Sequence, residues 1–309
     1  MTHYPFALIE YRRAGPITDS TLLLKRPFTE IKGCLREDAQ LYVPGDLLET
    51  AINTALAVGE PILITGESGT GKTQAAYYAA YKLGVEPVMH FQVKSDTTAK
   101  DLLYHFDTVR YFHDAHMEKE GRPLDKANYI EKRALWQAFE AAVPQVLLID
   151  EIDKAPRDFP NDLLHELDQM EFYVPEISRT IQAARALRPV VFITSNSERR
   201  LPEPFLRRCV YHHLQFDEAL VREAVNRRRA SFARLSDSLI DTAMRRFMDL
   251  RSRPLRKLPS TGEFLVWLRI LSIANGTYPE PLEKDLSKLP YLGTLLKDHQ
   301  DIADVGRGR

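Results

Sequence analysis

Eight consecutive residues have the types and the spacing of a phosphate-binding loop. They read Gly66, Glu67, Ser68, Gly69, Thr70, Gly71, Lys72 and Thr73, which matches G-x-x-x-x-G-K-[ST]. Glycines let the backbone fold around a phosphate so that its N–H groups point inward, and the helix expected to follow adds its positive N-terminal dipole. Lys72 is the cation expected to reach the β- and γ-phosphates, and the hydroxyl of Thr73 is an expected Mg²⁺ ligand. The sequence therefore predicts a site for ATP and Mg²⁺.

Two carboxylates follow a short apolar run further along the chain. Residues 146–149 are typical of a buried strand, and Asp150 and Glu151 come directly after them. In P-loop enzymes an aspartate in such a place holds the Mg²⁺ shell, and an adjacent glutamate can act as general base towards the attacking water. A strand followed by an aspartate that caps a helix is the alternative, but the P-loop upstream favours catalysis. We therefore expect Asp150 to bind the nucleotide and its Mg²⁺, and Glu151 to be the base.

A third polar position follows another strand-like run. Residues 190–194 are apolar up to their last residue, and Ser195 and Asn196 come next. An amide at this strand end would lie between the P-loop and Glu151, where it could orient the attacking water. An asparagine that forms a turn is the alternative. The sequence makes Asn196 a candidate catalytic residue.

Strands and helices alternate around these motifs. Strands are expected over 62–65, 88–93, 146–149, 190–194 and 210–214, and helices over 72–83, 129–142 and 163–170. A further helix is expected to begin at Asp46, which can cap it, with Glu49 in capping-box spacing. This alternation is typical of a parallel α/β sheet.

Beyond about residue 217 the pattern changes to amphipathic helices, near 219–230, 239–250 and 263–274. The predicted fold class is α/β, a P-loop NTPase parallel-sheet core followed by an α-helical lid domain. The expected boundaries are an N-terminal extension over 1–41, the nucleotide-binding core over 42–216, the lid over 217–280 and a C-terminal tail over 281–309.

The overall composition excludes several other classes of protein. The formal net charge is −1, from 42 basic and 43 acidic side chains, so the whole molecule has no electrostatic attraction to nucleic acid or acidic lipid. The two cysteines, Cys34 and Cys209, form no paired motif, which excludes a disulfide framework and suits a reducing compartment. The sequence has no signal-type apolar run and none long enough to span a bilayer. We expect a cytoplasmic protein with neither membrane nor nucleic acid as a partner.

Together these motifs resemble those of the AAA+ ATPases, and within them of the MoxR-like group. The shared segments are the P-loop, Ile149–Lys154, Asp158–Leu164, Thr194–Asn196 and Leu206–Cys209, and the resemblance covers roughly residues 42–271. It implies ATP hydrolysis by a five-stranded core, a helical lid that closes on the nucleotide, and a homo-oligomeric ring that usually has six subunits.

The resemblance also assigns roles to individual residues. It makes Asn196 the first sensor residue, and it makes Arg207 or Arg208 the finger that completes the site of a neighbouring subunit. A solvated helix end is the alternative explanation for these two adjacent arginines. It further implies an apolar slot for adenine near Tyr42 and Val43.

MoxR-like proteins typically work with a von Willebrand factor A-type partner and remodel or activate a third protein. The resemblance therefore implies a partner of that type and a client protein. The segments Tyr111–Lys132 and Glu171–Ala184 fall where this group carries a helical insert and a β-hairpin, which we expect to line the face or the pore of the ring. Ordinary charged surface loops are the alternative.

One departure from the family pattern concerns the lid. Many AAA+ proteins carry an arginine at the start of the lid helix, whereas Pro259–Glu263 contains none. Either Lys257 or Arg269 takes that place, or the lid senses the nucleotide differently. The second sensor residue is therefore left unassigned.

Two other functions stay open at this point. A nucleic-acid-handling AAA+ ATPase such as a helicase loader would explain the dense arginines of the lid, although the net charge and the lack of a recognisable DNA-binding appendage argue against it. The other is a scaffold that binds nucleotide without hydrolysing it. Glu151 and Asn196 argue against that, because such a scaffold has no use for a positioned base.

Overall fold

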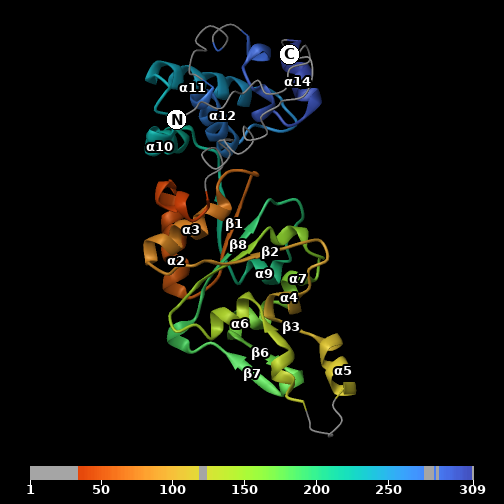
Figure 1. The fold of residues 1–309 in the computed structure, drawn as a ribbon. Coiled ribbons are helices and arrows are strands. Elements are labelled where there is room, and N and C mark those ends of the chain that lie inside the picture. Colours follow the sequence, from red (N-terminus) through yellow and green to blue (C-terminus); the bar gives the residue numbers. More distant parts are fainter. Residues whose placement is uncertain (1–33, 118–123, 275–281, 283–284, 308–309) are drawn as a thin grey trace, which may run out of the picture. The chain divides into compact units, whose positions relative to one another are not determined.

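The structure, a computed structural model, describes residues 34–117, 124–274, 282 and 285–307. The chain divides into two compact units (Figure 1). The first unit is Pro44–Phe216, and the second consists of the described parts of Met1–Val43 and Asp217–Arg309. The expected start of the core at residue 42 and of the lid at residue 217 lie close to these divisions. Residues 1–33 of the expected N-terminal extension lie outside the described part.

A five-stranded parallel sheet forms the centre of the first unit, in the order β2-β5-β8-β1-β9. Every residue of β1 and β5 is buried, because strands covered on both faces need apolar side chains on both. The expected parallel α/β core is confirmed. Its strands are β1 (Ile62–Gly66), β2 (Met89–Gln92), β5 (Val146–Asp150), β8 (Val190–Ser195) and β9 (Val210–Leu214).

Helices cover both faces of this sheet. On one side, α2 (Asp46–Val58) and α3 (Lys72–Leu83) contact the strands, and α3 has the predicted bounds because Gly84 ends it with φ +68°. On the other side, one apolar cluster joins the sheet to four short helices, of which α6, α7 and α9 are labelled in Figure 1. These are α6 (Ala134–Phe139), α7 (Phe159–Asp162), α8 (Leu164–Gln169) and α9 (Glu203–Leu206).

Two small antiparallel strand pairs are added to this core. β6 (Glu171–Val174) and β7 (Arg179–Gln182) form the expected hairpin. The expected helix over 129–142 is wrong in its first part, because β4 (Ile130–Lys132) pairs with β3 (Tyr104–Phe106) and the helix α6 begins only at Ala134. The remaining helices of this region are α4 (Ala99–Leu103) and α5 (Thr108–Met117).

The start of α2 differs from the expected capping box. The N-cap is Gly45, with φ +73°, and no side chain caps the helix. Asp46 is the first helical residue, and the carboxylate of Glu49 instead accepts a hydrogen bond from the hydroxyl of Tyr78 on α3. The negative charges of Asp46 and Glu49 therefore interact favourably with the positive end of the helix dipole, but they form no capping box.

The second unit is helical. Phe247 and Phe264 stack at 4.4 Å in its core, and Ser260 and Glu263 form a capping box at the start of the lid helix. The segment expected as a tail packs here instead, with Leu289, Leu295, Leu296 and Val305 at most 4% exposed. The helices are α10 (Glu218–Arg227), α11 (Asp237–Arg251), α12 (Thr261–Ile273) and α14 (His299–Gly306). Within the described residues of both units, no helix has the length and apolar character to cross a membrane.

Candidate functional site

Glycines shape the P-loop between β1 and α3. Gly66, Gly69 and Gly71 have φ of +148°, +77° and +98°. At Gly66 a Cβ would also lie 2.6 Å from the carbonyl oxygen of Leu214 on β9, so both the dihedral and the space require glycine. The conformation of the loop therefore depends on the backbone freedom of its glycines and on the close approach of β9.

Lys72 points back into the loop that precedes it. Its Nζ donates to the carbonyl oxygens of Gly66 and Glu67, both at 2.8 Å, and the residue is 6% exposed. Burial lowers the pKa of this ammonium, although nearby carboxylates, Asp153 foremost, oppose the shift. Neutral carbonyls bind an ammonium less strongly than a phosphate does, so the cation remains available to an anionic ligand.

Asp150 gathers donors from three elements at the carboxyl end of β5. The hydroxyl of Thr73 on α3 donates to its two oxygens at 3.0 and 3.2 Å, and the hydroxyl of Thr194 on β8 donates at 2.5 Å. His90 on β2 lies 3.1 Å from Oδ2. Burial alone would raise the pKa of Asp150, but the hydrogen bonds from His90, Thr194 and Thr73 outweigh it and hold the pKa below its ordinary value. The carboxylate is therefore kept ionised beside Thr73.

The imidazole of His90 has a second partner, Tyr77, on the side away from Asp150. The hydroxyl of Tyr77 on α3 lies 3.1 Å from Nδ1, and the two rings meet edge to face with centroids 6.0 Å apart. In the tautomer whose Nε2 donates to Asp150, Nδ1 accepts from the hydroxyl of Tyr77. Tyr77 follows Thr73 by one helical turn, so a single face of α3 supplies both ends of this chain of contacts.

Glu151 lies beside Asp150 with its two carboxylate oxygens in different surroundings. Oε2 accepts from Gln92 Nε2 on β2 at 2.7 Å and from Lys154 Nζ at 2.5 Å. Oε1 lies 3.4 Å from Nδ2 of Asn196, at the long end of hydrogen-bond range. The backbone of Glu151 has φ +60°, which non-glycine residues rarely adopt, and its N–H donates to Thr194 Oγ1 at 2.9 Å.

Asp153 fixes the loop that carries Asn196. Its carboxylate accepts from the backbone N–H groups of Asn196 at 3.2 Å and Glu198 at 2.9 Å, and the residue is 3% exposed. The segments after β5 and β8 are thereby tied together. The structure thus brings Lys72, Thr73, Asp150, Glu151 and Asn196 to one edge of the sheet.

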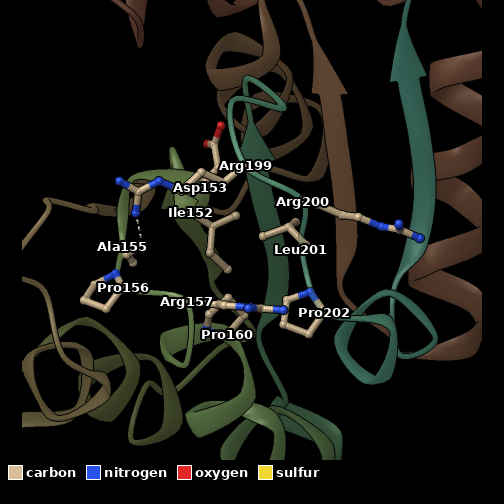
Figure 2. Close-up of a pocket in the computed structure, with 10 residues that line it drawn as sticks. All are labelled: Ile152, Asp153, Ala155, Pro156, Arg157, Pro160, Arg199, Arg200, Leu201 and Pro202. Carbon is tan, nitrogen blue, oxygen red and sulfur yellow. Dashed lines mark hydrogen bonds between the residues drawn. The ribbon is translucent and has the colours of Figure 1, made fainter.

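A cavity of about 350 Å³ opens next to these two segments, between residues 152–160 and 199–202 (Figure 2). Buried Ile152, Ala155 and Pro160 contribute apolar surface to it. Three arginines also line it, and we call it the arginine pocket. They are Arg157, which extends towards Pro202, Arg199, which donates to the carbonyl of Ala155 at 3.2 Å, and Arg200, which points outward.

The two candidate finger residues differ in their surroundings. Both follow α9. Arg208 is held within its own subunit, because its Nε donates to Asp168 Oδ2 at 2.5 Å and one Nη donates to the carbonyl of Pro204 at 2.9 Å. The side chain of Arg207 is 80% exposed, and its one ion pair with a described residue is a 3.9 Å contact with Glu203. Arg207 is therefore the freer of the two.

Several predicted residues belong to the helical unit. The carbonyl of Tyr42 accepts from Arg227 at 2.9 Å, and Tyr42 and Val43 lie in that unit, so the adenine slot stays a prediction. Arg269 is 8% exposed and lies 3.8 Å from Asp38, which places it inside the unit's own core. The backbone N–H of Lys257 donates to Asp301. The second sensor residue is left unassigned here as well.

The donor set fits a nucleotide with Mg²⁺. The hydroxyl of Thr73 and the carboxylate of Asp150 are oxygen ligands 3.0 Å apart, and Lys72 with the P-loop amides supplies positive charge for phosphate. Within the described ranges no three His, Cys, Asp or Glu residues form a metal site by themselves. Mg²⁺ usually keeps waters and substrate phosphates among its ligands, so one or two protein oxygens suffice.

The structure brings four further residues to the site, to which the sequence analysis assigned no role: His90, Gln92, Lys154 and Thr194. The first two reach the site through strand register, since Gln92 on β2 pairs with Asp150 on β5. Their short strand carries no motif. Thr194 lies two residues before Asn196, and strand alternation could have found it.

One family model matches the part of the chain that contains this site. Residues 61–209, which hold all of its residues, match the family model of the AAA domain, dynein-related subfamily. A proposed ATPase from Cytophaga hutchinsonii is 14% identical, with 88% of this chain and 92% of that chain covered at a TM-score of 0.42. NtrX from Brucella abortus, solved in complex with ADP, is 17% identical, with 89% of this chain and 58% of that chain covered at a TM-score of 0.46. No curated protein matches the sequence.

Proposed function

Since this chain belongs to the AAA+ ATPases through its domain of residues 61–209, we propose that it hydrolyses ATP to ADP and phosphate with Mg²⁺. One observation carries the proposal. Asp150 lies against Thr73 of the P-loop, and Glu151 presents Oε1 beside the amide of Asn196. A site that only held nucleotide would need the first contact and not the second.

The roles of the catalytic residues follow from their contacts. Oε2 of Glu151 is occupied by Gln92 and Lys154, which leaves Oε1 as the oxygen that takes a proton from water. The amide of Asn196 lies next to Oε1 and orients that water. A positioned general base contributes about 10²–10⁴-fold to a rate.

The remaining groups bind and orient the nucleotide. The P-loop amides and Lys72 hold the phosphates, and Lys72 exchanges its two carbonyl partners for phosphate oxygens. Thr73 and Asp150 hold Mg²⁺, with the carboxylate of Asp150 kept ionised by its hydrogen bonds. When bound there, Mg²⁺ would offset the negative charge of the phosphates.

We also propose the finer function of a MoxR-like ring ATPase that remodels or activates a client protein together with a von Willebrand factor A-type partner. The exposed Arg207 supports a shared active site in a ring. Exposed apolar side chains on α5 and on the β6–β7 hairpin support contact with other proteins; these are Val109, Phe112 and Tyr173, at 82%, 55% and 58% exposure. A Glu151→Gln protein with ATP should retain such a partner, and a Lys72→Ala protein should not.

Two substitutions test hydrolysis. Lys72→Ala should abolish ATP binding, because it removes the cation that lies within the phosphate loop. Glu151→Gln should keep ATP binding and lose turnover by about 10²–10⁴-fold. Titration calorimetry measures the binding, and phosphate release measures the turnover. Equal loss of binding in both variants would mean that Glu151 is not the base.

A further inference from the structure

The arginine pocket carries positive charge that its surroundings do not offset. Arg157 makes no hydrogen bond or ion pair within the described part of the chain, and Arg199 donates only to a neutral carbonyl. Arg200 has an 86% exposed side chain and a carboxylate no nearer than 3.9 Å. The carboxylate of Asp153 already accepts two backbone N–H groups. The pocket is therefore complementary to an added carboxylate.

The rest of the lining defines what should accompany that carboxylate. Ile152 and Ala155 are 1% and 3% exposed, and Pro160, Leu201 and Pro202 complete an apolar wall. The volume of about 350 Å³ lies at the lower end of ligand pockets, which suits one or two side chains better than a large molecule. The ligand that would fit the arginine pocket is therefore an acidic side chain next to an apolar one.

The start of α2 presents this pair of residues. Leu47 is 78% exposed, although burial of its apolar side chain would be favourable. Asp46 precedes it, is exposed, and has a side chain with no hydrogen bond or ion pair in the described residues. At the other end of α2, Val58 is also exposed, at 57%, but its neighbours Ala57 and Gly59 carry no charge that could meet the arginines.

The two features lie on opposite sides of one compact unit. α2 covers one side of the sheet, and the pocket segments lead into α7 and α9 on the other (Figure 1). One copy cannot bring them together, whereas two copies can. A contact between two different patches is heterologous, so it repeats and closes into a ring when the rotation allows.

We infer that Asp46 and Leu47 of one copy dock into the arginine pocket of the next copy, with the carboxylate against Arg157 and Arg199 and the leucine on the apolar wall. This contact rests on the proposed ring and specifies its interface. Arg200 of the pocket and Arg207 each lie 3.9 Å from Glu203, so the proposed docking site is next to the candidate finger.

Substitutions in the protein of residues 1–309 test this docking. Sedimentation velocity measures the protein concentration at which half of the chains are assembled. Leu47→Glu should raise that concentration by about 10- to 100-fold, from the lost burial of one leucine. Asp46→Arg and Arg157→Glu should each weaken assembly by about tenfold or more. The double variant Asp46→Arg/Arg157→Glu should recover most of the loss, because opposite charges meet again.

Val58→Glu is the matched control, since it places the same charge on the same helix at an exposed position, and it should leave assembly unchanged. Thermal unfolding shows whether each variant folds. The inference is overturned if Leu47→Glu assembles like the wild type, if Val58→Glu disrupts assembly equally, or if the charge swap gives no recovery. A wild-type chain that stays monomeric overturns it too. Assembly that follows these expectations without ATP hydrolysis would instead refute only the ATPase proposal.

Discussion

His90 lies 3.1 Å from Asp150, and Tyr77 lies 3.1 Å from the other nitrogen of the same imidazole. Loss of a group that forms a hydrogen bond to a metal ligand typically lowers metal affinity or activity by about 10- to 100-fold. Asp150 is the proposed Mg²⁺ ligand here. We predict that His90→Ala raises the Mg²⁺ concentration needed for half-maximal binding of a fluorescent ATP analogue by about 10- to 100-fold. Nucleotide affinity without Mg²⁺ should stay the same.

His90→Gln provides the control for that variant, because its amide can still donate to Asp150. It should restore most of the Mg²⁺ dependence, and Tyr77→Phe should change it only a few-fold. If His90→Ala and His90→Gln behave alike, or if Mg²⁺-free binding falls equally, His90 supports the fold and does not orient the metal ligand.

The second prediction separates the two adjacent arginines. Arg207→Ala should leave ATP binding intact and reduce turnover by about 10³-fold or more, the range reported for arginine fingers. Arg208→Ala should mainly lower the thermal midpoint, because Arg208 is tied to Asp168 in its own subunit. Phosphate release and thermal unfolding measure the two effects.

Mixing Arg207→Ala with Glu151→Gln gives the sharper measurement. One orientation of the mixed interface pairs an intact base with an intact finger, so part of the turnover should return. A mixture that stays inactive in demonstrably mixed rings, or a monomer with full turnover, would show that Arg207 does not act in trans.

The third prediction concerns Gly66. Gly66→Ala should lower the free energy of unfolding by about 1–3 kcal/mol, because its Cβ would meet the backbone of Leu214 as well as an unfavourable φ. Gly59→Ala has the unfavourable φ of +73° with no atom within 4 Å of the added Cβ, and should cost about 1 kcal/mol. Urea unfolding compares them. Equal losses would show that Leu214 yields to the methyl group.

The fourth prediction concerns Cys209. Burial, with smaller effects of Glu60 and Asp168, raises the pKa of its thiol to about 12, from an ordinary value of 9.0. The folded protein should therefore hold about a thousandfold less Cys209 thiolate at pH 8 than the unfolded chain. Alkylation by iodoacetamide, followed by mass spectrometry, should modify exposed Cys34 and spare Cys209 until urea is added. The rate at Cys209 should still rise above pH 9, and a plateau there would contradict the raised pKa.

The same shift has a consequence for stability. Because the pKa of Cys209 is raised on folding, the unfolded thiol ionises first as the pH rises from 9.0 towards 12, and the free energy of unfolding falls over that interval. Cys209→Ser should show a weaker decline.

The sequence predicted the features that local chemistry decides. The helix Lys72–Leu83 begins in the P-loop and ends at a glycine, and both signals lie within a few residues of its ends. The strand that ends at Asp150 and the strand that directly precedes Asn196 were found from their apolar runs. Features that depend on distant pairing were missed. Ile130–Lys132 is a strand only because Tyr104–Phe106 pairs with it.

His90 and Gln92 show the same limit at the site. Nothing in residues 89–92 indicates contact with Asp150 or Glu151, because the contact arises from the parallel register of β2 on β5. Asp46 shows the opposite error. Its spacing to Glu49 predicted a capping box. In the structure Gly45 is the N-cap residue, and the carboxylate of Glu49 accepts a hydrogen bond from Tyr78. Sequence spacing indicates which contacts are available, and packing decides which ones form.

The division of the chain also sets an order of synthesis. The helical unit draws on residues before Pro44 and after Phe216, so the α/β unit is inserted within it. At 5–20 residues per second, a ribosome needs about 10–35 s to make the inserted unit. During that time the sheet can fold, whereas Leu41 and Tyr42 must wait for Arg228 and Arg227 to emerge before their carbonyls find donors. The whole α/β unit is thus synthesised before the helical unit can begin to fold.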